Sequence, residues 1–201
     1  MSTVAPSSRW KGGVSPYGMS WQKLMMWWFI ITDALLFMGF LVAYGVNRLA
    51  ADAWPARADI FDLDFFIPAM TFVLITSSAT MACAVAASRS GDQKATARYT
   101  WLTILGGAIF LGMQVIEWSH IIDAGARLDG NPWGVRGFSA FFFTITGFHG
   151  LHVLTGVIIL LVVALRASKG RARPAGVELA GLYWHFVDLV WVFVFGCFYL
   201  L

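Results

Sequence analysis

Seven ionisable side chains stand inside long apolar runs of this sequence, and they are the residues that could do chemistry. A titratable group at the depth of a lipid bilayer is costly, so it faces the interior of a helical bundle or a partner protein. Six of the seven form pairs at i, i+3, a spacing that brings both side chains toward one face of a helix. The pairs are Glu117 with His120, His149 with His152, and His185 with Asp188, and the seventh residue is Asp33.

The paired residues allow two interpretations. Glu-x-x-His on a helix is part of the ligand set of di-iron bundles, and His with carboxylate suits iron, copper or zinc. A complete di-iron set needs two such pairs and two further Glu, whereas only Glu117 and His120 have this form. We therefore favour the second interpretation. It is a polar seam of hydrogen-bonded residues between packed helices, with no catalytic residue and no metal ligand in the chain.

Asp33 stands alone in its apolar run. Its carboxyl could contact lipid or carry a proton, and it could equally be a structural hydrogen-bond acceptor. A proton carrier needs a polar relay, and no continuous relay leads from Asp33 along one helix. The sequence also lacks the paired interrupted helices that transporters place at mid-membrane. Both roles of Asp33 therefore stay open at this point.

The elements that must position these residues are membrane-spanning helices. Of the 201 residues, 59% are hydrophobic and only 12% are charged, whereas about a quarter of a soluble domain is charged. A helix needs about 20 mostly apolar residues to cross a bilayer. The sequence predicts an all-α polytopic membrane protein, with a leader at 1–23 and a five-helix domain at 24–201. The expected spans are 24–46, 65–88, 97–122, 138–165 and 178–201.

Charge predicts how these spans are oriented. Ten Lys or Arg residues fall in or beside the leader and the connections after the second and fourth spans, against four in or beside the other two connections. The positive-inside rule then places the N-terminus in the cytoplasm and the C-terminus outside. Six Asp residues lie in the two outer connections, and such a negative face could steer a basic partner. A net charge of +3, divided among the loops, does not indicate nucleic-acid binding.

Three stretches resemble the signatures of subunit III of the haem–copper oxidases. Residues 146–153, TGFHGLHV, followed by Gly156, resemble the pattern TGFHGxHVxxG. Residues 183–191, YWHFVDLVW, resemble YWHFVDxVW in the last helix of the family. Residues 105–118, LGGAIFLGMQVIEW, are similar to a third family helix, with Trp118 where Tyr is usual. The resemblance is collinear over nearly the whole chain.

The resemblance implies a subunit without redox chemistry of its own. Subunit III of this family binds no haem or copper, packs directly on catalytic subunit I, holds phospholipid between its helices and is thought to support proton uptake. Haem and copper would then belong to partner subunits, and the partners would be subunits I and II, phospholipid and a larger respiratory supercomplex. The expected location is the inner membrane of a bacterial cell.

Two features depart from the full-length pattern of the family. That form has seven helices, and its N-terminal pair forms one arm of a lipid-holding cleft, whereas this chain has room for five. Shorter five-helix forms occur in bacterial oxidases, where another subunit can supply the pair. The first matching helix of the family also carries Ser-Glu, whereas this sequence has Thr32 and Asp33. Any shared role of that carboxyl passes to Asp33.

The sequence thus predicts a non-catalytic accessory subunit of a proton-pumping cytochrome c oxidase in aerobic respiration. It would stabilise the catalytic subunit and support proton uptake. A quinol oxidase and a nitric oxide reductase remain alternative parent complexes, because the electron donor binds other subunits. A self-contained di-metal membrane enzyme and a small transporter are the alternatives from other functional classes.

Overall fold

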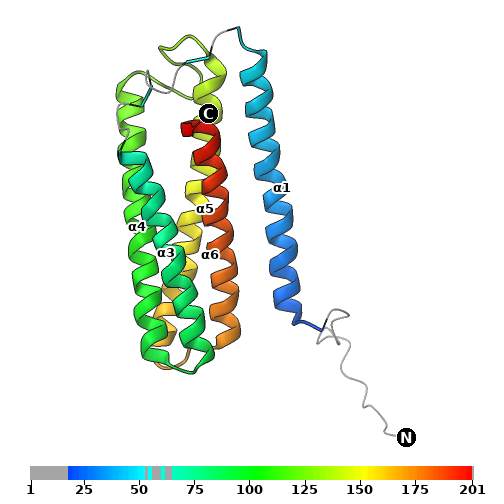
Figure 1. Ribbon diagram of the computed structural model, residues 1–201, viewed down its shortest axis with the longest axis vertical. Helices are drawn as coiled ribbons and strands as arrows, with labels where there is room; N and C mark the ends of the chain where they lie inside the picture. The colour runs from blue at the N-terminus through cyan, green and yellow to red at the C-terminus, as the bar shows by residue number, and fades with distance from the viewer. Residues whose placement is uncertain (1–17, 53, 56–59, 62–64, 201) are drawn as a thin grey trace, which may run out of the picture.

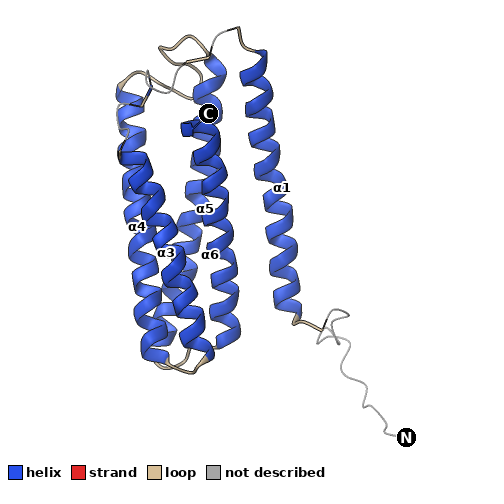
Figure 2. Cartoon of the chain, in the orientation of Figure 1, coloured by secondary structure: helices blue, strands red, loops and turns tan. Residues whose placement is uncertain are grey.

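The computed structural model describes residues 18–52, 54–55, 60–61 and 65–200, and the regular elements of these residues are all helical. Figure 1 shows the course of the chain and Figure 2 its helices and loops. The helices are α1 (Trp21–Ala50), α3 (Phe66–Arg89), α4 (Gln93–Asp123), α5 (Arg136–Ser168) and α6 (Pro174–Phe195), followed by the π-helical turn η2 (Gly196–Leu200).

The five predicted spans are confirmed, since five helices are long and apolar enough to cross a membrane. Several helices begin earlier than predicted, because polar turns extend them beyond their apolar parts. Ser20 caps α1 by accepting a hydrogen bond from the backbone N–H of Lys23, and Asp92 caps α4 by accepting one from that of Ala95. Pro174 occupies the first turn of α6, where its missing N–H costs little.

The connections differ between the two ends of the molecule. At the end where α1 begins, short turns join α3 to α4 and α5 to α6, and Gly91 and Gly170 take positive φ values of 81° and 67° there. We call this the basic end, because Lys and Arg gather in its turns. The opposite end, which we call the acidic end, carries the α1–α3 and α4–α5 connections with their Asp residues.

Helices α3, α4, α5 and α6 form a four-helix bundle, and α1 stands along one side of it (Figure 1). Only a narrow stripe of α1 is buried, at Asp33, Phe37 and Tyr44, whose spacing follows the helical repeat. The rest of its surface is apolar and exposed, as at Leu35 and Val42. The bundle therefore positions the polar residues, and α1 closes one of its sides.

Helix α6 lies at the centre of the packing. Its Trp184 is fully buried and passes between two glycines of neighbouring helices. A Cβ atom on Gly107 would lie 2.5 Å from the indole, and one on Gly156 would lie 2.8 Å from it. Close approach at these glycines agrees with a packing role for small residues. Gly112 of α4 and Gly150 of α5 make no such close approach, because a Cβ atom on either would face open space.

The last helix does not continue regularly to the C-terminus. The sequence predicted one span over 178–201, but α6 ends at Phe195 and the chain continues as the π-helical turn η2. Gly196 begins this turn, and π-turns inside helices are frequent at functional positions. Tyr199 lies in η2 and is 3% exposed, so the irregular turn places a phenol inside the bundle.

Candidate functional site

Asp33 and His152 form a contact between α1 and α5. Oδ2 of Asp33 lies 3.3 Å from Nε2 of His152, a distance at which charges interact but longer than the usual N–H···O hydrogen bond. Both side chains are mostly buried. Nδ1 of His152 lies 2.8 Å from the carbonyl oxygen of Phe148. The predicted i, i+3 partner of His152 on its own helix is thus replaced by a carboxylate from another helix.

The geometry of this pair limits where its proton can be. The carbonyl of Phe148 can only accept, so Nδ1 of His152 carries a hydrogen and donates it. Nε2 faces Oδ2 of Asp33 across 3.3 Å, so the imidazole and the carboxyl are electrostatic partners inside the membrane.

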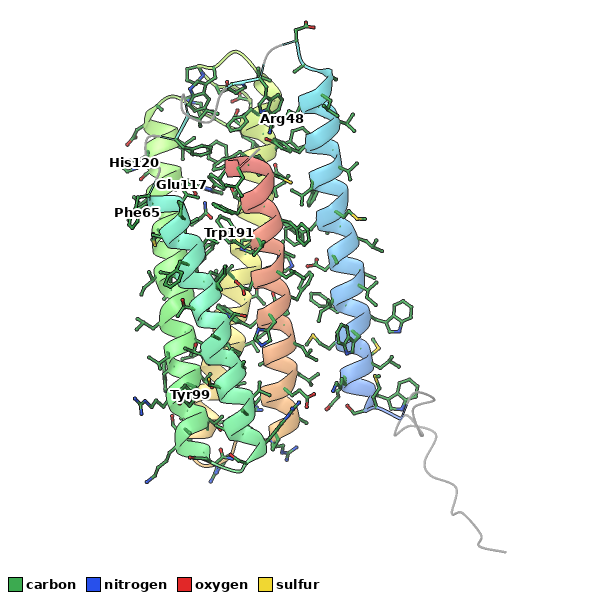
Figure 3. The ribbon with its side chains drawn as sticks, in the orientation of Figure 1. Arg48, Phe65, Tyr99, Glu117, His120 and Trp191 are labelled. Atoms are coloured by element: carbon green, nitrogen blue, oxygen red, sulfur yellow. The ribbon has the colours of Figure 1, made fainter. Side chains whose placement is uncertain are left out.

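Glu117 is the centre of a second cluster, inside the bundle near the acidic end (Figure 3). The phenol of Tyr199 donates to its Oε1 at 2.6 Å, and Nε2 of Gln114 donates to its Oε2 at 2.7 Å. These bonds join α4 to η2. His120 lies at the edge of the bundle and is exposed, whereas Glu117 is buried, and both residues border one cavity near the acidic end. Residues at i and i+3 differ by about 60° around a helix, enough to place one inside and one outside.

His149 is the most buried of the histidines, with no exposed surface. Its ring packs against Trp191 at 5.1 Å and against Phe110 at 5.8 Å between ring centroids. Within the described residues neither ring nitrogen has a hydrogen-bond partner. Aromatic rings from α4 and α6 pack around His149, and its place in a polar seam stays a prediction.

His185 and Asp188 meet Ser78 of α3. Nδ1 of His185 lies 2.6 Å from the hydroxyl of Ser78, and Asp188 interacts with both His185 and Ser78. Both members of this i, i+3 pair lie near the same serine, and the contact of His185 with Ser78 joins α6 to α3. The hydroxyl partner could not be chosen from the sequence, because several Ser and Thr residues follow one another on α3.

The motif at the middle of α6 makes further bonds to its neighbours. Nε1 of Trp184 donates to the hydroxyl of Ser77 at 3.1 Å, and Nε1 of Trp191 donates to that of Thr71 at 3.0 Å. The phenol of Tyr183 donates to the carbonyl oxygen of a residue of α5 at 3.0 Å. Side chains of α6 thus bond this helix to α5 on one side and to α3 on the other. Their polar groups are engaged in holding helices together.

An ionic cluster at the basic end was missed by the sequence analysis. Oε1 of Glu178 lies 2.6 Å from Nζ of Lys23 and 3.3 Å from Nη2 of Arg89, so one carboxylate joins α6 to α1 and α3. The sequence placed Glu178 at the very start of a span and therefore in the interface region. Lys23 and Arg89 also lie at span ends on the same side of the membrane as Glu178, and this shared location is the sequence signal that could have predicted the cluster.

Two cavities follow one another along the seam between α1 and the α5–α6 pair. One of about 330 Å³ lies at the basic end and is bordered by Arg166 and Arg173. The next, of about 370 Å³, lies deeper and is bordered by Met26, Phe29 and His152. We call this seam the α1 groove. It is cationic at its mouth, apolar along its wall, and it reaches the Asp33–His152 pair.

The polar residues do not converge on one centre. Among the residues that the structure describes, no three His, Cys, Asp or Glu side chains come together as metal ligands would. Glu117 and His120 have the form of a di-iron ligand pair, but Glu117 is buried and bonded to Tyr199 and Gln114, whereas His120 is exposed. The arrangement is suited to joining helices at several depths.

Comparison with known proteins identifies the family. The family model described as cytochrome c oxidase subunit III matches residues 4–201. The chain is 33% identical over 178 residues to cytochrome c oxidase subunit 3 of Thermostichus vulcanus, covering 86% of this chain and 84% of that protein. It is 36% identical over 173 residues to cytochrome c oxidase subunit 3 of Corynebacterium diphtheriae, covering 83% and 82%. It is also 32% identical over 183 residues to quinol oxidase subunit 3 of Bacillus spizizenii, covering 89% and 86%. The chain belongs to the cytochrome c oxidase subunit III family, and it is the multi-pass membrane subunit III of a multi-subunit haem–copper oxidase.

Proposed function

We propose that this chain is a non-catalytic subunit that stabilises the catalytic subunit of a proton-pumping cytochrome c oxidase and supports its proton uptake. The observation that carries the proposal is the use of the motif on α6. Trp184, His185 and Trp191 each bond to a hydroxyl of α3, so the most characteristic side chains hold the fold together. A rigid apolar bundle of this kind is suited to bracing a neighbouring membrane protein.

Purification of the intact complex tests this role. A tag on the chain should recover subunits I and II together with haem absorbance and oxidase activity from native membranes. Removing the chain should leave haem and copper in the complex while its activity decays faster during turnover. A tagged chain that purifies without any haem protein, or that itself carries stoichiometric iron, would contradict the accessory role and favour a di-metal enzyme.

Cytochrome c is the proposed electron donor of the parent oxidase. Relatives named cytochrome c oxidase subunit 3 support it, and so do the Asp residues of the acidic end, since a negative face attracts a basic protein. The quinol oxidase relative keeps quinol as the second candidate donor. The purified complex should reduce oxygen with reduced cytochrome c and not with a quinol. Oxidation of quinol alone, or reduction of nitric oxide in place of oxygen, would reassign the parent complex.

A phospholipid is the proposed occupant of the α1 groove. Arg166 and Arg173 at its mouth suit an anionic headgroup, and Met26 and Phe29 suit an acyl chain. Native mass spectrometry of the complex should find lipid that survives delipidation. The double change Arg166→Gln and Arg173→Gln should reduce the occupancy of the lipid. The control change Arg98→Gln, at an exposed residue of α4 away from the groove, should not reduce it. Equal lipid retention in both variants would contradict this assignment.

Asp33 is the proposed residue for the link to proton uptake, because its mostly buried carboxyl faces the imidazole of His152. Replacing it with Asn should lower steady-state turnover of the complex or shorten its active lifetime. Unchanged turnover and lifetime would reject the role.

The proposed location is the inner membrane of a bacterial cell, with the basic end in the cytoplasm. A cysteine at Ser90, in the exposed turn between α3 and α4, checks the orientation. It should react with a membrane-impermeant maleimide from the cytoplasmic side alone. Labelling from the opposite side would invert the topology.

A further inference from the structure

Buried polar atoms without a partner gather in one part of the molecule. Among the described residues, six side-chain nitrogen or oxygen atoms are buried and make no hydrogen bond. Four of these atoms belong to Asp33, Gln114 and His149, and the Asp33 atom is Oδ2, which lies 3.3 Å from Nε2 of His152 without forming a hydrogen bond to it. Native proteins satisfy nearly all buried polar groups, and where no protein group is available an ordered internal water does so. The clustering of the four atoms therefore points to a shared cause.

These three residues follow one another across α1, α5 and α4. Asp33 contacts His152, and His149 lies one turn from His152 on α5. On the other side of His149, the ring of Phe110 packs at 5.8 Å between centroids. Gln114 follows Phe110 by one turn, and both residues are buried on the same face of α4. His149 thus stands between the Asp33 pair and Gln114.

Gln114 leads on to the surface at the acidic end. Its amide donates to Glu117, which also accepts from Tyr199. Glu117 borders a cavity of about 370 Å³, whose rim includes the exposed residues His120 and Asp123. Polar groups therefore extend from the middle of α1 to the acidic end, and the interruption in this series is at His149.

We propose that His149 binds internal water, and that this water joins the Asp33–His152 pair to the Gln114–Glu117–Tyr199 cluster in one hydrogen-bonded file. A neutral imidazole offers one donor and one acceptor, and the free amide oxygen of Gln114 accepts. A bridging water then finds the about two to four polar partners that it needs. Phe110 and Trp191 keep the other sides of the imidazole apolar.

The file gives Asp33 a proton connection to the acidic end. The Glu117 carboxyl, the water and the His149 imidazole can each accept one proton while releasing another, whereas the Gln114 amide holds the water through its oxygen and transfers no proton. Exchange can then pass from the cavity through Glu117 and the water at His149 to the Asp33–His152 pair. At the basic end, the α1 groove beside that pair is walled by apolar side chains. The acidic end is opposite the proposed cytoplasmic end, so this inference is separate from the proposed role of Asp33 in proton uptake, and it does not depend on the electron donor or on lipid in the groove.

Direct imaging is the first test. A cryo-electron microscopy map of the intact oxidase, at a resolution that shows ordered water, should contain density within hydrogen-bond distance of a ring nitrogen of His149 and of Oε1 of Gln114. A map with well-defined side chains in which the His149 nitrogens touch only carbon atoms overturns the proposal. Direct bonding of His149 to a protein group overturns it equally.

Chemical labelling of Asp33 is the second test. A hydrophobic carbodiimide reacts with protonated carboxyl groups, and peptide mass spectrometry measures its reaction with Asp33 in oriented proteoliposomes of the complex. The pH is varied on each side separately. The titratable groups facing Asp33 are His152 of α5 and Tyr183 of α6, and all the variants below retain them. In the wild type, labelling should follow the pH on the side of the acidic end.

Three variants make this result specific. His149→Phe keeps a ring of similar size and removes both nitrogens, so the dependence on pH at the acidic side should weaken severalfold. Gln114→Leu interrupts the same file on α4 and should act in the same way, which covers failure of the first variant to assemble. Phe143→Leu changes a ring packed on Trp118, away from the file, and should label like the wild type. Labelling that follows the basic side, or that is the same in all variants, overturns the proposal.

Discussion

Helix α1 and the bundle of α3 to α6 are held by different kinds of contact. In the bundle, buried aromatic and hydroxyl side chains make neutral hydrogen bonds, of which the bond from Trp184 to Ser77 is representative. Helix α1 is joined to the bundle by a narrow buried stripe and by the ion pairs of Lys23 and Asp33. The α1 groove lies between these two ion pairs along the same seam.

The difference follows from what each interface must do. A neutral bond between an indole and a hydroxyl requires fixed helix positions, and glycines at Gly107 and Gly156 bring those helices close. An ion pair acts over a longer distance and accepts looser geometry. The bundle is therefore built for a single packing, while α1 can remain attached beside a space that another molecule fills.

Removing the central indole of the bundle should have the largest effect on stability, and it should be much larger than the effect of removing an indole of α1. Trp184→Ala deletes a fully buried side chain between three helices and should cost about 3–5 kcal/mol. We expect loss of the chain from the purified complex, measured by subunit stoichiometry after mild detergent extraction. Trp28→Ala on α1 is the matched control, because Trp28 is 58% exposed. Equal loss of the chain in both variants would contradict a bundle centred on α6.

Removing the phenol that binds Glu117 should have the next largest effect. Tyr199→Phe leaves a buried carboxylate oxygen without its donor, which costs about 1–3 kcal/mol. The thermal unfolding temperature of the chain in detergent should fall accordingly. Tyr99→Phe, near the basic end, changes the same group away from Glu117 and should leave that temperature nearly unchanged (Figure 3). An equal fall of the unfolding temperature in the Tyr99→Phe control would show that the Tyr199–Glu117 bond in η2 contributes no more to stability than another phenol does.

The Asp33–His152 pair should affect the attachment of α1 more than the bundle. Asp33→Ala leaves Nε2 of His152 without its partner at a cost of about 1–3 kcal/mol, whereas Asp33→Asn retains a polar group there. Limited proteolysis after detergent extraction should cut the α1–α3 connection faster in the Ala variant alone, with the bundle fragment intact. Unchanged cleavage in the Ala variant would show that the apolar stripe suffices to hold α1.

The ion pair at the basic end should have the smallest effect. Lys23 and Glu178 are partly exposed, so Lys23→Gln should cost about 1 kcal/mol or less. The same proteolysis assay should show a small increase in cleavage at low salt and none at high salt, because salt screens exposed charges. A large effect that persists at high salt would indicate that this contact resembles those inside the bundle.

The number and class of the helices could be predicted because each apolar run is long enough to cross a bilayer. The partners of the polar residues could not be predicted in the same way. Glu117 and Tyr199 are 82 residues apart, and Tyr199 reaches Glu117 from a π-helical turn that periodicity does not reveal. The exposure of His120 could not be predicted from its spacing to Glu117, because side chains at i and i+3 are separated by about 60° around the helix.

His149 illustrates a different limit of the sequence. A histidine in an apolar run predicts a polar partner, yet aromatic rings pack around this one, and no described residue bonds to its nitrogens. Aromatic residues are so common in the chain, at 16%, that their arrangement around His149 could not be singled out. Glu178 was missed for a related reason, because its two basic partners lie on other helices.

The two hydroxyls that accept hydrogen bonds from indoles of α6 also donate to their own helix. Ser77 donates to the carbonyl oxygen of Leu74, and Thr71 donates to that of Ile67. During synthesis α6 is the last of these helices to leave the ribosome, so α3 must wait in the lipid before its indole partners exist. Because each hydroxyl is already satisfied locally, the nascent chain can wait there without exposing an unpaired donor to lipid. Completion of the bundle then adds contacts to a segment that is already stably inserted.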